Sequence, residues 1–407
     1  MISATEAHRI IQSSNIPDNL IKVIDIELES ANGLYLAEDI YATRNQPPFN
    51  RSMMDGIAIS SKNDSKSYRC ESIARAGFEQ LELKDSDCCI EVMTGAPVPS
   101  GCDCVIPYEE VHKVNDTFEL KDKDYPVAAH KFIHREGSDY KVGDLLLVKG
   151  VIINSTIISL LSSIGLSSVK VFELNSIAIV STGDELIEPG EGLETHQIYR
   201  SNPYAIRSEL LNFFPKSEIK LFHLDDDEKE VLSGLANILE NHKIVIISGG
   251  VSKGKYDYIP RSLKTLGVNE LFHKVKQRPG KPLWFGSGSK GQIVFGLPGN
   301  PVSSLVNTRR HIIPLLEKFL NPKRSSNYSV KALVDREIGS SFTHFIPVSL
   351  SVVEGTIYAE PSTGNNSGDF SKLVFSKGLI EVPSDEGRII KDKLYQFFPW
   401  GSLEVHL

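Results

Sequence analysis

The sequence predicts a multidomain protein in which an α/β domain is combined with β-rich domains, and three observations support this prediction. The chain has 407 residues, which exceeds the length of one typical domain. Between residues 175 and 322, short apolar runs alternate with segments of helical periodicity, a pattern typical of a parallel sheet with helices on both faces. Before and after this stretch, short alternating segments separated by polar turns indicate β structure.

We expect four domains, with boundaries where the composition changes. The segment 44–48 contains two prolines and reads as a linker, and a new pattern of apolar runs begins after Ser176. A β-rich module is predicted to be inserted into the first domain. The predicted parts are a split N-terminal domain (1–44 and 141–174), the inserted β-rich module (45–140), the α/β domain (175–322) and a C-terminal β domain, either a small barrel or a sandwich (323–407).

Composition and charge narrow the class of protein. The net charge of −8 argues against a chain that binds nucleic acid along its length. The sequence has no run of 18 apolar residues and no apolar N-terminal core of signal-peptide length, so we predict neither a membrane span nor a secretion signal. Five cysteines, an odd number without metal-type spacing, indicate reduced thiols and a cytoplasmic protein. Cys102 and Cys104 are either metal ligands or, as we prefer, two small buried residues.

The first 174 residues predict a few helices and many short strands. Helical spacing predicts a helix that begins at Thr5 and another over 151–161, and alternation predicts strands over 23–28 and 169–174. In the inserted module, the dipeptide at Asp55 predicts a turn that leads into a strand. An Asp at such a turn is either a turn former or a metal ligand.

The α/β domain is predicted from four apolar runs, each followed by a helical pattern. The predicted strands are 177–180, 220–223, 244–247 and 293–295, and the predicted helices begin near Asn202, Val231, Pro260 and Val302. Three of the strands end in polar glycine loops, at 181–186, 248–252 and 296–300. Ligands of parallel α/β sheets lie at the carboxyl ends of the strands, so these loops are candidates for binding a nucleotide or phosphate.

The loop at 296–300 precedes a predicted helix N-terminus. Asn300 suits the N-cap and Pro301 the first helical position. Such a junction either binds an anion through backbone N–H groups or is an ordinary connection between strand and helix. The common P-loop and G-x-G-x-x-G fingerprints are not found in the sequence. The basic segment 274–282 is either a solvated loop or a rigid loop that holds basic side chains against a bound anion.

The C-terminal part predicts strands over 330–334, 346–353, 378–382 and 395–398, with a long polar loop at 361–369.

Seven motifs, in order along almost the whole chain, resemble those of the molybdopterin molybdenumtransferase family, which includes the enzymatic domain of the animal scaffold protein gephyrin. They occupy residues 52–58, 93–97, 135–139, 181–186, 248–252, 279–282 and 296–303. The resemblance implies that the α/β domain binds molybdopterin and that the protein inserts molybdate into adenylylated molybdopterin, releases AMP and needs Mg²⁺. It also implies a homodimer in which the partner's β-rich module contributes to the active site. The upstream molybdopterin adenylyltransferase is a further candidate partner.

The resemblance also implies roles for individual residues. The metal and catalytic acids of the α/β domain would be Glu185, Asp225 and Asp257, and the β-rich module would bring Asp55, Thr94 and Asp139. For Asp226 and Asp227 we predict only turn or N-cap roles. The residues expected to bind the cofactor substrate are Thr182, Gly183, Asp184, Ser248, Gly249, Gly250, Ser252, Pro298, Gly299, Asn300 and Ser303, and those expected to bind molybdate are Lys276, Arg278, Lys281 and Ser367.

The sequence departs from the family pattern at proposed contacts. Arg278 stands where members usually have Lys, and the segment 342–345 lacks the usual arginine at its first position. Lys253 and Lys255 stand where members carry an apolar and an acidic residue, and the loop around Ser367 is reduced to Asn-Ser-Gly. Two alternatives to the enzyme therefore remain at this stage. One is a non-catalytic molybdopterin-binding or scaffold protein, and the other is a molybdopterin adenylyltransferase.

Overall fold

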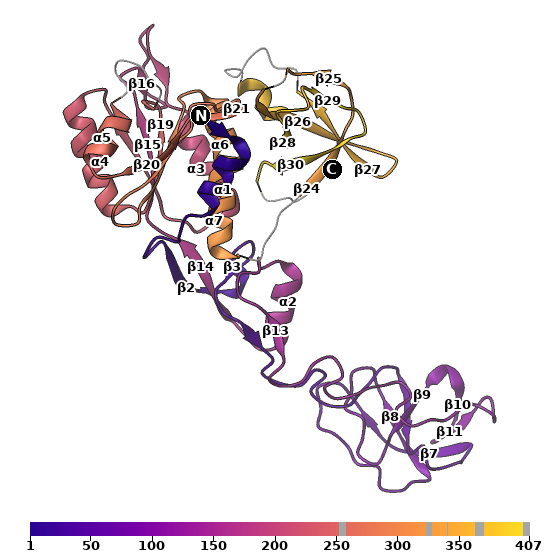
Figure 1. The fold of residues 1–407 in the computed structure, drawn as a ribbon. Coiled ribbons are helices and arrows are strands. Elements are labelled where there is room, and N and C mark those ends of the chain that lie inside the picture. Colours follow the sequence, from indigo (N-terminus) through magenta and orange to yellow (C-terminus); the bar gives the residue numbers. More distant parts are fainter. Residues whose placement is uncertain (252–257, 323–327, 340, 363–369, 402–407) are drawn as a thin grey trace. The chain divides into compact units, whose positions relative to one another are not determined.

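The computed structural model describes residues 1–251, 258–322, 328–339, 341–362 and 370–401 (Figure 1). The chain forms two compact units. The first comprises residues 1–38, 149–159 and 167–407, and the second comprises residues 39–148 and 160–166. The second unit therefore begins before the linker at Arg44 and continues beyond residue 140. The division into four domains stays a prediction.

The first unit contains a mixed six-stranded sheet. Four parallel neighbours, β18 (Ile219–Leu224), β15 (Ile177–Thr182), β19 (Ile244–Ser248) and β23 (Ile293–Leu297), include all four strands predicted for the α/β domain. Two further strands, which the sequence analysis did not predict, extend this parallel sheet in the antiparallel direction. β22 (Trp284–Ser287) lies antiparallel to β23, and β20 (Asn269–His273) lies antiparallel to β22. The segment between β22 and β23 is too short for the crossover that a parallel pair requires, so the chain turns back as a hairpin.

Helices cover both faces of this sheet, as predicted (Figure 1). One hydrophobic cluster joins the sheet to α3 (Asn202–Phe213), α6 (Pro301–Asn307) and α7 (Ile313–Leu320). A π-helical turn, η3 (Thr308–Ile312), connects α6 and α7 within the helix predicted from Val302 onward. The second cluster joins the opposite face to α4 (Glu228–Asn241) and α5 (Ile259–Thr265). The continuous apolar runs are explained by this burial on both faces.

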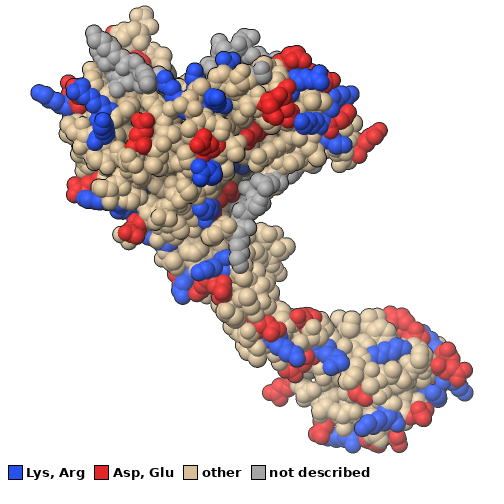
Figure 2. Space-filling model, in the orientation of Figure 1, with Lys and Arg blue, Asp and Glu red and all other residues tan. Residues whose placement is uncertain are grey.

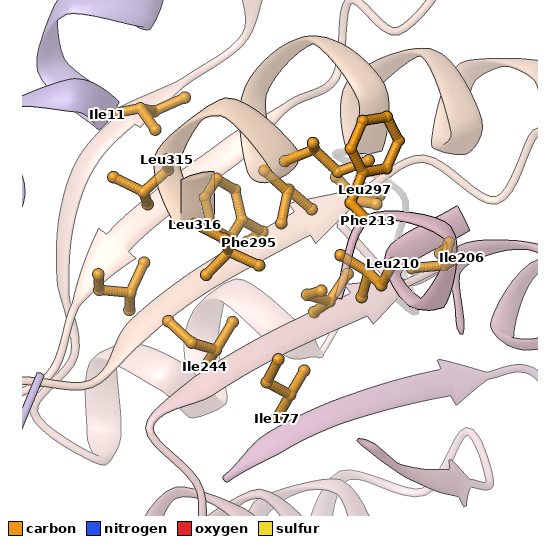
Figure 3. Close-up of a cluster of buried hydrophobic side chains, with 14 of the residues drawn as sticks. Ile11, Ile177, Ile206, Leu210, Phe213, Ile244, Phe295, Leu297, Leu315 and Leu316 are labelled. Atoms are coloured by element: carbon orange, nitrogen blue, oxygen red, sulfur yellow. The ribbon is translucent and has the colours of Figure 1, made fainter. Parts of the chain in front are cut away.

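The N-terminal helix packs on the same core. α1 (Ala4–Gln12) begins at the N-cap Ser3, whose side chain accepts a hydrogen bond from the backbone N–H of Glu6. Ile11 lies beside Leu315 and Leu316 of α7, as Figure 3 shows. The preceding strand β1 (Ile2–Ser3) pairs with β21 (Val275–Arg278), so the N-terminus borders the basic segment.

The other elements of the first unit up to residue 200 are short. β14 (Ser168–Leu174) pairs with β2 (Ile21–Glu27) and β3 (Tyr35–Leu36), and η1 spans Leu28–Ser30. α2 (Ser155–Ser163) contributes residues to both units. β16 (Leu186–Ile187) pairs with β17 (Ile198–Tyr199) beside the first glycine loop.

The C-terminal part of the first unit is a closed sheet. β26 (Thr343–Val353) pairs with both β27 (Thr356–Pro361) and β28 (Gly378–Val382), and β24 (Tyr328–Ala332) and β30 (Leu394–Pro399) complete the ring. The barrel alternative is therefore confirmed. β21 pairs with the start of β26, which places the basic segment against the barrel. The remaining elements are β25 (Arg336–Glu337), β29 (Arg388–Ile389) and η4 (Phe370–Phe375).

The second unit is β-rich, as predicted for this part of the chain. Its main sheet has the order β10-β11-β7-β8-β6-β9, and the unit also contains two small pairs, β4 with β13 and β5 with β12. The bounds are β4 (Ile40–Tyr41), β5 (Arg51–Ser52), β6 (Gly56–Ile59), β7 (Ser67–Ala74), β8 (Cys88–Val92), β9 (Cys104–Pro107), η2 (Tyr108–Glu110), β10 (Val111–Val114), β11 (Thr117–Leu120), β12 (Ile133–His134) and β13 (Leu145–Leu147).

The surface charges and the helices relate to two expectations from the sequence, that the chain does not bind nucleic acid along its length and that it has no membrane span. Basic and acidic side chains are interspersed on the faces of both units that Figure 2 shows. Within the described residues, no helix is long and apolar enough to cross a bilayer. Of the two cysteines considered as metal ligands, Cys104 is buried and Cys102 is half-buried, and burial raises the pKa of both thiols.

Candidate functional site: two adjoining pockets

The first pocket lies at the carboxyl ends of β15, β19 and β23 and has a volume of about 520 Å³. All three polar glycine loops contribute to its wall, so the structure brings together segments more than 100 residues apart in sequence. The lining residues include Ser181, Thr182, Gly183, Glu185, Asp226, Ser248, Gly249, Gly250, Pro298 and Gly299. Asp184 is not among them, and Ser252 lies outside the described residues.

Glycine is required where two of these loops approach each other. Gly250 has a φ of +63°, and a Cβ there would stand 2.9 Å from Thr182 Oγ1 and 2.8 Å from a side-chain carbon of Ile259. Gly183 has a φ of +134°, and a Cβ there would stand 2.5 Å from a carboxylate oxygen of Glu185. The absence of a side chain at Gly183 allows the Glu185 carboxylate to fold back over its own loop at the pocket wall.

Asn202 joins two of the loops, a role that the sequence analysis missed. Its side-chain amide donates to Ser248 Oγ and to the backbone oxygen of Gly299, both at 2.8 Å. The sequence contained one signal, because Asn202 was expected at the start of a helix whose N-terminus follows the first glycine loop. Arg200 and Tyr199 also line the pocket and were missed. The Arg200 guanidinium pairs with Glu188.

Replacing Asn202 by Ala is expected to loosen these loops. Both hydrogen bonds are lost together, so we expect the backbone amides of residues 248–251, 297 and 299 to exchange with solvent roughly tenfold faster. Hydrogen exchange followed by mass spectrometry measures this effect. Asn212→Ala, near the other end of α3, is the matched control, and equal exchange in the two variants would contradict a bridging role for Asn202.

The helix N-terminus at Asn300 is capped by its own side chain. The Asn300 carboxamide oxygen accepts from the Ser303 backbone N–H at 3.1 Å and from the Ser303 hydroxyl at 3.2 Å. The predicted N-cap is thereby confirmed. Gly299 and Pro301 line the first pocket whereas Asn300 does not, and Ser303 lines the second pocket described below. The cofactor-binding roles given to Asn300 and Ser303 stay predictions.

The acidic residues divide differently from the sequence-based assignment. Asp226 lines the first pocket, whereas Asp225 does not and instead lies 3.6 Å from the His223 ring. Asp184 accepts from the backbone N–H of Asp226 at 2.8 Å. Asp227 caps α4 by accepting from the N–H groups of Lys229 and Glu230, which confirms its predicted N-cap role. Asp257 lies outside the described residues.

The donor atoms in the pocket wall suit a divalent cation. Among residues that the structure describes, no group of three or more His, Cys, Asp or Glu side chains is arranged to hold a metal ion. Mg²⁺ typically needs only one or two carboxylates together with waters and substrate phosphates. Glu185 and Asp226 supply two carboxylates in the pocket wall, so the described oxygen donors fit Mg²⁺ bound together with a phosphate-bearing ligand.

The second pocket, with a volume of about 700 Å³, lies between the basic segment and the barrel of the same unit. Arg278, Lys281, Arg336 and His344 line it, and Pro282 lines both pockets. The pocket lining omits Lys276, although Lys276 was predicted with Arg278 and Lys281, and Ser367 lies outside the described residues.

A buried polar network supports the loop that carries these cations. The Gln277 side chain donates to Asn307 Oδ1 at 2.8 Å and lies 3.1 Å from the His311 ring. Gly280 has a φ of +88°, and a Cβ there would stand 2.6 Å from the Asn307 amide nitrogen. The loop at 278–281 is therefore pressed against α6 and the π-helical turn, which restricts its conformations.

The residues predicted from the β-rich module form two hydrogen-bonded groups in the second unit. Thr94 donates to Asp55 Oδ1 through its backbone N–H at 2.6 Å and through its hydroxyl at 2.7 Å. Asp139 Oδ1 lies 2.8 Å from His134 Nε2, and the Arg51 guanidinium lies 3.0 Å from His134 Nδ1. His134 and Arg51 were missed. The arrangement suits a neutral ring that accepts from Arg51 and donates to Asp139.

Thr94→Val is expected to raise the pKa of Asp55. Two hydrogen bonds from Thr94, the backbone bond first and then the hydroxyl bond, hold the pKa of Asp55 below its ordinary value. The variant removes the second bond, so the carboxylate becomes protonated at a higher pH than in the wild type. Carbon NMR titration of the Asp55 carboxyl group measures the change, with Asp55→Asn used for assignment. Thr94→Ser keeps the hydroxyl and should keep the low pKa, and a wild-type titration in Thr94→Val would contradict this account.

Comparisons with known proteins cover all parts of the chain. Residues 2–165 match the family model of the MoeA N-terminal region (domain I and II), residues 178–318 match that of a probable molybdopterin-binding domain, and residues 330–391 match that of the MoeA C-terminal region (domain IV). The molybdopterin molybdenumtransferase of Synechocystis sp. is 34% identical over 407 residues, covering 98% of this chain and 100% of the relative. A protein of the same name from Staphylococcus epidermidis is 31% identical over 391 residues, covering 94% and 91%.

Solved structures agree with these sequence relatives. A crystal structure of the molybdopterin biosynthesis MoeA protein from Pyrococcus horikoshii has a TM-score of 0.80 at 26% identity and covers 98% of this chain and 99% of that one. A second structure of that protein has a TM-score of 0.77 at 25% identity, with 98% and 100% coverage. The family models, the near-complete relatives and the fold lead to one conclusion: the chain belongs to the molybdopterin molybdenumtransferase family and is an enzyme of molybdenum cofactor biosynthesis.

Proposed function

We propose that this protein inserts molybdate into adenylylated molybdopterin and releases AMP. The observation that carries the proposal is the adjoining pair of pockets that share Pro282. One is lined by glycine loops and carboxylates, which suits the phosphates of the adenylylated substrate. The other is lined by Arg278, Lys281 and Arg336, which suits a small oxyanion.

The loops of the first pocket would bind the phosphate groups and the bridge between molybdopterin and AMP. Backbone N–H groups of Gly250 and of the loop after β15 are neutral donors that can bind phosphate oxygens without adding charge, whereas the N–H of Gly249 already donates to the backbone oxygen of Leu297. The bond that breaks is the phosphoanhydride bridge. An oxygen nucleophile attacks the molybdopterin phosphorus, and AMP leaves with the bridging oxygen. The asparagine bridge at Asn202 would keep two of the loops at a constant separation during this step.

Mg²⁺, when bound, would supply neutralisation of the negative charge that develops on the leaving phosphate oxygens. We infer that Glu185 and Asp226 would hold it, with Asp225 and Asp257 as the further candidates from the family resemblance. Glu185 is suited to this task because its carboxylate lies over Gly183, at the loop where the phosphates would approach.

We further propose a cytoplasmic homodimer in which Asp55, Thr94 and Asp139 act on the substrate bound by the partner. This part rests on the family resemblance. In support, Thr94 donates two hydrogen bonds to Asp55, which fix the position of this carboxylate and lower its pKa. The molybdopterin adenylyltransferase that makes the substrate is the proposed upstream partner.

The test is AMP release from adenylylated molybdopterin by the purified protein, with and without molybdate and Mg²⁺. We expect release only when both are present. Tight substrate binding without release under any of these conditions would overturn the proposal and favour a scaffold. Consumption of ATP with molybdopterin would instead favour an adenylyltransferase. Release of AMP with tungstate but not with molybdate would indicate that tungstate is the oxyanion substrate.

A further inference from the structure

The second pocket is cationic on both of its sides. The basic segment contributes Arg278 and Lys281, and the barrel contributes Arg336. Glu337 is the acidic residue among the described lining residues, so three cations and one carboxylate leave a net charge of +2. Burial, together with the charge of Arg278, lowers the pKa of His344, so this ring adds no charge at neutral pH. The net charge matches that of a tetrahedral dianion.

Phe342 occupies the position where the family pattern would place an arginine. Its ring contacts Arg278, the residue that stands where family members usually have Lys. The Arg278 guanidinium lies 4.8 Å from the centre of the Phe342 ring, and the Lys281 ammonium lies 5.7 Å from it. Cations over an aromatic face are attracted to it, and a stacked guanidinium keeps its edge free to donate in its plane. Phe342 therefore orients Arg278 and carries no charge of its own.

Arg336 approaches the same space from another strand of the barrel domain. It belongs to β25, which pairs with β29 through Arg336 and Ile389. Its Nη1 donates to the backbone oxygen of Ser362 at 3.1 Å. This bond uses one of the five N–H donors of the guanidinium and fixes the side chain in the pocket wall.

We propose that Arg336 is the barrel's oxyanion-binding residue in this protein and that it replaces the guanidinium absent at position 342. The oxyanion would be held between Arg336 on one side and Arg278 and Lys281 on the other, with Phe342 orienting Arg278. This inference rests on the proposed function, because it assigns a specificity residue to the molybdate pocket of that reaction. It assigns the contact to a residue outside the seven motifs.

Isothermal titration of the full-length protein with molybdate tests the proposal at constant ionic strength. Arg336→Met is expected to weaken molybdate binding by ten- to a hundredfold, because charge-assisted hydrogen bonds to the anion are lost. The molybdate affinity of Arg336→Lys should lie between those of Arg336→Met and the wild type. The matched control is Arg388→Met, since Arg388 lies on the paired strand, is exposed and does not line the pocket.

A rescue variant separates a direct contact from a structural effect. Adding Phe342→Arg to Arg336→Met returns a guanidinium to the barrel side and should recover part of the lost affinity, measured against Phe342→Arg alone, which accounts for the loss of the ring that orients Arg278. In turnover, Arg336→Met should raise the KM for molybdate while the affinity for AMP in the first pocket stays at the wild-type value. A parallel loss of AMP affinity would indicate a general disturbance and overturn the assignment.

The outcomes distinguish this inference from the proposed function. Wild-type molybdate affinity in Arg336→Met would overturn the inference, while molybdate-dependent AMP release by the wild type would leave the proposed function standing. A selective loss in Arg336→Met without rescue by Phe342→Arg would overturn the replacement of position 342. A wild-type protein that binds no molybdate and releases no AMP would overturn both.

Discussion

Glu185→Gln is expected to lower the rate of AMP release by at least about a hundredfold while the protein still binds its substrate. The variant keeps the size and shape of the side chain and removes the charge that would hold Mg²⁺. The position of the carboxylate over Gly183, at the wall of the phosphate pocket, is the basis for this expectation. Substrate affinity should change little, because the loop amides that would bind the phosphates are unaltered.

Initial rates of AMP release and titration with AMP, each over a range of Mg²⁺ concentrations, measure the two quantities separately. Glu194→Gln is the matched control, because Glu194 is exposed and lies outside the pocket lining. A Glu185→Gln protein that keeps more than a tenth of the wild-type rate at ordinary Mg²⁺ concentration would contradict a metal-binding role for this carboxylate.

Gly56→Ala is expected to destabilise the second unit by about 3 kcal/mol, the upper part of the range for overpacked sites. Gly56 lies in β6, between β8 and β9, opposite Val92 and Pro107. A Cβ at this position would stand 2.0 Å from the backbone oxygen of Ile106 and 2.9 Å from the backbone of Pro107. Backbone atoms of a paired strand cannot rotate away as a flexible side chain can, so the ladder between β6 and β9 must distort.

Hydrogen exchange of the β6, β8 and β9 amides measures this loss within the second unit, and the amides of β15 and β19 in the first unit serve as an internal reference. Gly77→Ala is the matched control. Gly77 has a φ of +84° but nothing within 4 Å of its Cβ position, so only backbone strain of about 1 kcal/mol is expected there. Wild-type exchange in β6 of Gly56→Ala would show that the strand accommodates the methyl group. Because Asp55 precedes β6, the same distortion should also displace its carboxylate from Thr94.

The candidate site was predictable where local pattern and strand direction determine position. Thr182, Ser248 and Pro298 follow strands that were predicted to be parallel, and parallel strands end at one edge of the sheet. Their convergence on one pocket therefore follows from the apolar runs alone. Asn300 was correctly identified as an N-cap, and the N-cap was one of the two roles predicted for Asp227, because a cap accepts from backbone N–H groups within the next three residues.

The site was less predictable where a contact depends on side-chain direction or on distant partners. Asp225 and Asp226 are adjacent in sequence, and only the path of the loop after β18 decides that Asp226 lines the pocket. Asn202 bonds to Ser248 and Gly299, which are 46 and 97 residues away. Arg336 shares a pocket with Arg278 because β21 pairs with β26 of the barrel. None of these contacts between distant residues produces a periodic pattern in the sequence.

Local patterns in the sequence were sufficient to predict the buried parallel strands, the helices on both sheet faces, the β-rich second unit, the glycine loops and the family. These features could be predicted because the periodic pattern of buried residues and the capping of helices both involve residues that are close together along the chain. The folded structure was needed to establish that β20 and β22 run antiparallel to their neighbours, that α1 packs against α7, and that two pockets meet at Pro282. These features depend on which distant segments come into contact, and that choice is made by the packing of the whole unit.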